Sequence, residues 1–173
     1  MKRTQLAMWA FLGIILLAGC ELLDPKSKKT EFTIAIHEIV KYPRASHIEK
    51  EIPTITGQTI WVSATPYLFS NCIKKIERVP NKEDAIFSDL KLTLNRRGSL
   101  IWMQLSVERN HRDLAFVVDG VFYRKVAPET VTTEKDEFVL LNVRLDNATA
   151  QAIEKASEDN YYFFNPDDKK SPF

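Results

Sequence analysis

Residue types that carry chemistry are scarce in this chain. Its 173 residues include only two cysteines, three histidines and five glycines. The histidines, His37, His47 and His111, do not combine with one another, with a cysteine or with an acidic residue at the spacing of a metal site. No serine stands in the Gly-x-Ser-x-Gly setting of a nucleophile, and Gly98 is not part of a phosphate-binding loop. We therefore predict no metal site, no cofactor and no catalytic residues, and we expect the histidines to be surface or edge residues.

An excess of charge of either sign is also absent. The chain has 24 lysines and arginines against 23 aspartates and glutamates, for a formal net charge of +1. Such a balance provides no long-range attraction to nucleic acid, so we expect no nucleic-acid partner. The hydrophobic content of 45% is sufficient for a folded core.

Long hydrophobic runs are missing except for one short run near the first residue. Leu6 to Leu17 is apolar and spans 12 residues, which is shorter than the about 20 that a membrane-spanning helix needs. Lys2 and Arg3 precede the run, and Leu17-Ala18-Gly19-Cys20 closes it. Basic residues, a short apolar run and small residues before a cleavage point are typical of a secretory signal peptide.

The last four of these residues resemble the bacterial lipobox. That resemblance implies diacylglycerol on the Cys20 thiol, cleavage before Cys20 and an acyl chain on its new amino group. Two or more acyl chains are enough for stable anchoring to a membrane. Glu21 is not the aspartate that retains some lipoproteins at the inner membrane, so we expect the outer membrane, with the protein facing the periplasm. The alternative is an ordinary signal peptide followed by an incidental cysteine.

This interpretation divides the chain into four parts. Residues 1–19 are the signal peptide, 20–30 the lipidated N-terminus and a flexible tether, 31–164 the folded domain, and 165–173 a disordered tail. With Cys20 acylated, Cys72 has no partner for an internal disulfide. We expect Cys72 to be a buried small hydrophobic residue, although an exposed thiol could pair with another molecule.

Hydrophobic periodicity predicts both strands and helices in the domain. Alternating or continuous apolar residues indicate strands, and helical spacing indicates helices from after Ser99 to about Glu108 and from Asp146 or Asn147 to about Asp159. The expected strands lie within 31–40, 52–65, 73–79, 86–94, 114–118, 121–126, 138–145 and 161–164. We predict an α+β fold with a ferredoxin-like split βαβ sheet, helices on one face, and extra N-terminal strands.

Two short segments within this pattern have specific interpretations. Asp119-Gly120 is a two-residue hairpin signal, because both positions tolerate a positive φ. We assign Asp119 a structural role in that turn and not a catalytic one. The aromatic run Tyr161 to Phe164 is interpreted as an edge strand, to which an extended peptide could add.

Three of these segments also suggest a family. Leu90-Lys91-Leu92-Thr93-Leu94, then Arg97-Gly98 before a helix, then the run from Leu114 to Val121 resemble the first periplasmic head domain of the SecD and SecDF protein-export components. The resemblance covers about residues 58–164. It implies the fold of that head domain and a role in handling exported chains. SecD proteins have several transmembrane helices, whereas no later segment here has that hydrophobicity, so the fold transfers better than the function.

These observations lead to one main hypothesis and two alternatives. The main hypothesis is a non-enzymatic envelope lipoprotein whose head-like domain binds another envelope protein or an exported chain. The first alternative is a small envelope enzyme with a site of scattered Asp, Glu and His residues, which predicts a polar pocket with perturbed carboxyl groups. The second is a purely structural lipoprotein without an exposed hydrophobic groove.

Overall fold

A computed structural model describes residues 29–108, 113–128 and 138–169. Cys20, the predicted signal peptide and most of the predicted tether therefore lie outside the described residues, as does His111. Within the described ranges, no helix has the length and hydrophobicity needed to cross a membrane.

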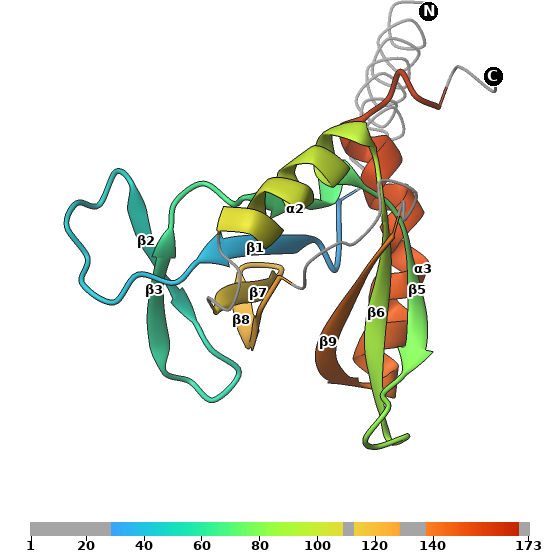
Figure 1. The fold of residues 1–173 in the computed structure, drawn as a ribbon, viewed down its shortest axis with the longest axis horizontal. Coiled ribbons are helices and arrows are strands. Elements are labelled where there is room, and N and C mark those ends of the chain that lie inside the picture. The colour runs from blue at the N-terminus through green and yellow to red at the C-terminus, as the bar shows by residue number, and fades with distance from the viewer. Residues whose placement is uncertain (1–28, 109–112, 129–137, 170–173) are drawn as a thin grey trace, which may run out of the picture.

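Strands and helices are mixed along the chain, as Figure 1 shows. The strands are β1 (Ile34–Glu38), β2 (Glu49–Pro53), β3 (Thr59–Ser63), β4 (Leu68–Phe69), β5 (Ile73–Pro80), β6 (Phe87–Leu94), β7 (Leu114–Val118), β8 (Val121–Val126) and β9 (Phe138–Asp146). The helices are the short 3-10 turn η1 (Ser70–Cys72), α2 (Arg96–Glu108) and α3 (Asn147–Phe164). The predicted α+β class, with additional strands at the N-terminal side, is confirmed.

The described strands form three antiparallel sheets. Their orders are β4-β1-β7-β8, β2-β3 and β5-β6-β9. The predicted split βαβ scheme has all strands after residue 86 in a single sheet. In the structure these strands divide between two sheets, with β6 and β9 in the three-stranded sheet and β7 and β8 in the four-stranded sheet. The reason is the N-terminal strand β1, which pairs along its whole length with β7, from Ile34 opposite Val118 to Glu38 opposite Leu114. β7 is therefore enclosed between β1 and β8.

The four-stranded sheet is covered on both faces. One face carries Ile34, Ile36 and Phe116 into the main hydrophobic core, which also includes side chains of β5, β6, β9 and α3. The other face carries Ala35 and Val117 into a second cluster against the β2–β3 hairpin. All five residues of β7 are buried, as expected for a continuous apolar strand between two layers.

Helix α3 packs on the three-stranded sheet and also covers the outer edge of β5. The side chains of Ser157 and Glu154 accept hydrogen bonds from the backbone N–H groups of Ile76 (3.2 Å) and Arg78 (3.1 Å). These backbone groups would otherwise be unpaired at the sheet edge. Side chains of the helix thus take the place of a neighbouring strand.

The predicted strand at Tyr161–Phe164 is wrong, because α3 continues through these residues to Phe164. The buried positions Ile153, Ser157 and Tyr161 recur every four residues, so Tyr161 belongs to the same buried helical face. The hypothesis of strand addition at this segment therefore loses its basis. After the helix, Asn165 to Asp168 forms a turn in which the Tyr161 hydroxyl donates a hydrogen bond to Asp168.

Candidate functional site

A cavity with apolar walls and a buried histidine lies between the four-stranded sheet and the β2–β3 hairpin. It has a volume of about 350 Å³. Its lining residues are Thr33, Ala35, His37, Lys50, Pro66, Phe69, Val117 and Gly120. In Figure 1 the hairpin stands beyond one end of β1, apart from α3 and the three-stranded sheet. We call this cavity the hairpin cleft.

His37 is the buried polar residue of the hairpin cleft. β1 turns Ile34 and Ile36 into the main core, so the alternate residues Ala35 and His37 face the hairpin. The His37 side chain is 2% exposed, and its Nδ1 lies 2.8 Å from the Ser63 carbonyl oxygen. A carbonyl only accepts, so Nδ1 carries the proton and donates, which leaves Nε2 as the acceptor of the ring.

The electrostatics of the cleft keep this ring neutral. Burial lowers the pKa of His37 from 6.5 to about 4, and the nearby Lys50 ammonium adds to the lowering, against the effect of the Ser63 hydrogen bond. Lys50 is the one formally charged residue that lines the cleft. With Pro66, Phe69 and Val117 as apolar walls, the cleft can accept an apolar group that brings a hydrogen-bond donor, with negative charge beside Lys50.

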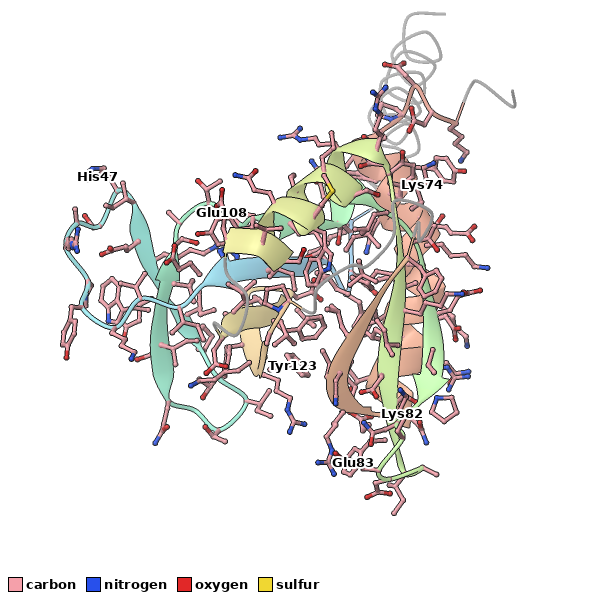
Figure 2. The ribbon with its side chains drawn as sticks, viewed as in Figure 1. His47, Lys74, Lys82, Glu83, Glu108 and Tyr123 are labelled. Atoms are coloured by element: carbon pink, nitrogen blue, oxygen red, sulfur yellow. The ribbon has the colours of Figure 1, made fainter. Side chains whose placement is uncertain are left out.

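Exposed apolar residues are present in the loops at both ends of β2. Tyr42 is 84% exposed, Ile48 51% and Ile55 64%. His47 projects from the far end of the loop before β2 in Figure 2, which agrees with the expected surface position. The same expectation was wrong for His37, because the hairpin covers the face of β1 that would otherwise be exposed. The sequence contains only a weak indication that His37 would be buried, because 11 residues separate it from β2, the first strand of the covering hairpin.

Asp119 precedes the cleft residue Gly120 and makes contacts beyond its own turn. Asp119 (φ 48°) and Gly120 (φ 80°) connect β7 to β8. The Asp119 carboxylate also accepts hydrogen bonds from the N–H of Phe32 (2.7 Å), the N–H of Thr33 (2.8 Å) and the Thr33 hydroxyl (2.9 Å). It thereby attaches the start of β1 to the β7–β8 turn. Thr33 and Gly120, one from each of these segments, both line the cleft.

Replacing Asp119 by alanine is expected to lower the free energy of unfolding by about 2 kcal/mol. The variant loses three hydrogen bonds to a charged acceptor and places alanine at a positive φ. Urea unfolding followed by circular dichroism measures the loss. Asp119→Asn, which tolerates this backbone conformation and keeps one acceptor oxygen, should lose less than half as much. Equal stability of the alanine variant and the parent protein would contradict this account.

The other groups with shifted pKa values have structural explanations. Hydrogen bonds from Thr149 at the start of α3 lower the pKa of Asp146, and hydrogen bonds and charge from Lys75 and Lys91 lower that of Glu77. Burial raises the pKa of the Cys72 thiol, which is 4% exposed, so the expectation of a buried cysteine is confirmed. Across the residues that the structure describes, no three His, Cys, Asp or Glu side chains are grouped as metal ligands.

Comparison with known proteins gives one kind of match. No protein-family model and no curated protein matches the chain. A structure described as that of a membrane component SecDF that enhances protein export matches with a TM-score of 0.52 over 77% of this chain, at 12% identity. A crystal structure of SecDF in a super-membrane-facing form matches with a TM-score of 0.50 over 76% of this chain, at 10% identity.

The fold is SecD-like. This agrees with the family suggested by the segments around Leu90, Gly98 and Asp119. The chain spans 64% of the length of the first matched structure and 19% of the second. At these identities the likeness establishes the fold of the SecD-like domain, and its activity has to be argued from its own residues.

Proposed function

We propose that this protein is a lipid-anchored protein of the bacterial cell envelope whose SecD-like domain binds an extended segment of another protein. The observation that carries the proposal is the hairpin cleft, in which the buried neutral His37 and the Lys50 ammonium adjoin apolar walls. The loops on either side of β2 also expose the apolar residues Tyr42, Ile48 and Ile55. Such a surface suits a peptide with an apolar side chain and a nearby carboxylate.

A binding role is favoured over the two alternatives. A purely structural lipoprotein has no need of a cleft with apolar walls or of exposed hydrophobic residues in the neighbouring loops. An enzyme with scattered acidic groups would have carboxyl groups with raised pKa values in a polar pocket. The carboxyl groups with shifted pKa values in the described residues, Glu77 and Asp146, are shifted downward by their own ion-pair or helix-cap partners.

Photocrosslinking of the full chain in cells tests the binding site. A photoreactive amino acid in place of Lys50, on the cleft, should give discrete adducts with envelope or exported proteins. The matched control is Lys82, which is also an exposed lysine and lies at the opposite end of the molecule (Figure 2). Identical adduct patterns at both positions, or none at position 50, would refute the cleft as a binding site.

The lipid anchor has a separate test at Cys20. Cys20→Ser removes the thiol that accepts diacylglycerol, so we expect complete loss of fatty-acid labelling and accumulation of the unprocessed precursor. Cys72→Ser is the matched control and should be labelled and processed like the parent chain, since Cys72 is buried in the folded domain. Normal fatty-acid labelling of the Cys20→Ser variant would show that the lipid is elsewhere or absent.

A further inference from the structure

Helix α2 has an apolar stripe on the face that points away from the protein. Its buried residues include Trp102 and Leu105, whereas Leu100 is 55% exposed, Met103 45% and Val107 74%. At 3.6 residues per turn, the spacing of three and then four places these exposed side chains on one line, opposite Trp102. A helix that needs only its inner face for the core would carry polar residues on this line.

The start of α2 lies close to the region where the described chain begins. Asn95 accepts a hydrogen bond from the Gly98 N–H in the first turn of α2 (2.8 Å). Asn95 also donates to the Asn71 carbonyl oxygen (3.2 Å), and Asn165, directly after α3, donates to the same oxygen (2.9 Å). The first turn of α2 and the last turn of α3 are therefore held together.

The same end of α3 holds the first described residues. Asn160 donates a hydrogen bond to the Glu31 carbonyl oxygen (2.8 Å), and Phe163 lines a cavity of about 300 Å³ together with residues 29–31. Tyr162 (38% exposed) and Phe163 (50% exposed) add aromatic surface here. Figure 1 shows the first turn of α2 beside the C-terminal end of α3, the rest of α2 extending over β1, and the β5–β6 turn at the opposite end of the three-stranded sheet.

We propose that the outer face of α2 lies in the headgroup region of the lipid bilayer to which Cys20 is attached. The apolar stripe formed by Leu100, Met103 and Val107 would be buried just below the headgroups, as in interfacial amphipathic helices. Tyr162 and Phe163 supply the aromatic contacts typical of a membrane interface. This inference rests on the lipid anchor of the proposed function.

The length of the segment after Cys20 and the charges along α2 both agree with contact between the stripe and a lipid bilayer. Eight residues lie between Cys20 and Lys29, and the chain from Cys20 to Lys29 reaches about 30 Å when extended, whereas α2 is about 20 Å long. The exposed Arg96 continues the stripe one turn before Leu100, where its guanidinium can contact lipid phosphates. Glu108 lies off the stripe and accepts a hydrogen bond from Gln104 (2.8 Å), so burial of the stripe does not require burial of this carboxylate.

Lipid quenching in vesicles tests the proposed contact with matched positions. Val107→Cys and Ile86→Cys are made separately in the full chain with Cys72→Ala, and each is labelled with an environment-sensitive fluorophore. The two parent residues are 74% and 73% exposed, but Ile86 is in the β5–β6 turn at the far end. The acylated proteins are reconstituted into phosphatidylcholine–phosphatidylglycerol vesicles that contain nitroxide lipid. Quenching should be at least about threefold stronger at position 107 than at position 86.

The possible outcomes test the contact of α2 with lipid separately from the lipid anchor at Cys20. Proteins that float with the vesicles but are quenched equally at both positions would overturn the α2 contact and leave the anchor intact. Proteins that do not float would overturn both. The label at position 107 could instead be shielded from water but not quenched by nitroxide lipid, with shielding that rises with protein density. This result would show that a second copy of the protein covers the stripe and would reject the lipid contact. Leu100→Glu combined with Met103→Glu should reduce quenching at position 107 to the level of position 86 without preventing flotation.

Discussion

Replacing Trp102 by alanine is expected to lower the free energy of unfolding by about 3–5 kcal/mol. Trp102 is 2% exposed and is among the largest fully buried side chains of the main core. The truncation loses the transfer free energy of the indole ring and leaves a cavity that the surrounding strands cannot fill by relaxation. Urea unfolding followed by far-ultraviolet circular dichroism measures the change without depending on tryptophan fluorescence.

Met103→Ala is the matched control for this variant. Met103 is the next residue of α2 but lies on the exposed stripe, so its loss should change the free energy of unfolding by no more than about 0.5 kcal/mol. Together the two variants separate the core face of α2 from its outer face. Comparable destabilisation by both would mean that the outer face is also packed within the protein.

The second large effect is a loss of stability in acid that comes from His37. Its pKa is about 4 in the folded protein and 6.5 in the unfolded chain. Between these values the unfolded chain binds a proton that the folded protein does not, so stability falls as the pH is lowered from about 6.5 to 4. The full contribution is about 3 kcal/mol, and it is present above pH 6.5.

Comparison of two asparagine variants isolates this contribution. In His37→Asn the side-chain amide can still donate to the Ser63 carbonyl oxygen but does not titrate, so its stability should fall much less between pH 6.5 and 4 than that of the parent protein. His47→Asn makes the same substitution at an exposed histidine and is the matched control. Carboxyl groups titrate in all three proteins, so their contributions to the pH dependence of stability cancel when the proteins are compared. If His37→Asn and the parent protein lose stability in parallel, the ring is not held neutral by burial.

Local periodicity was a reliable guide to single elements in this protein. The alternation of Leu90, Leu92 and Leu94 corresponds to β6, and the continuous run at 114–118 corresponds to β7, which is covered on both faces. The aromatic run after residue 160 was assigned wrongly because aromatic residues favour strands intrinsically. The buried helical face that reaches Tyr161 outweighed this preference.

Pairings over long sequence distances could not be predicted from these patterns. The predicted strand at 31–40 has no local feature that identifies 114–118 as its partner, yet this pairing decides how the strands divide into sheets. The same limit applies to the site. Asp119 was recognised by its turn, but its three hydrogen bonds reach residues 86 and 87 positions earlier. The hairpin that buries His37 likewise acts across the fold.

The covered edge of β5 has a consequence for how copies of this protein behave when they are crowded. If the protein is lipid-anchored as proposed, its copies diffuse in two dimensions on one membrane surface and meet often, and an open strand edge would let them join into continuous sheets. At β5, Ser157 and Glu154 already occupy the N–H groups of Ile76 and Arg78 that an approaching strand would need. A neighbouring copy would first have to displace α3, so this side of the sheet resists polymerisation even at high surface density.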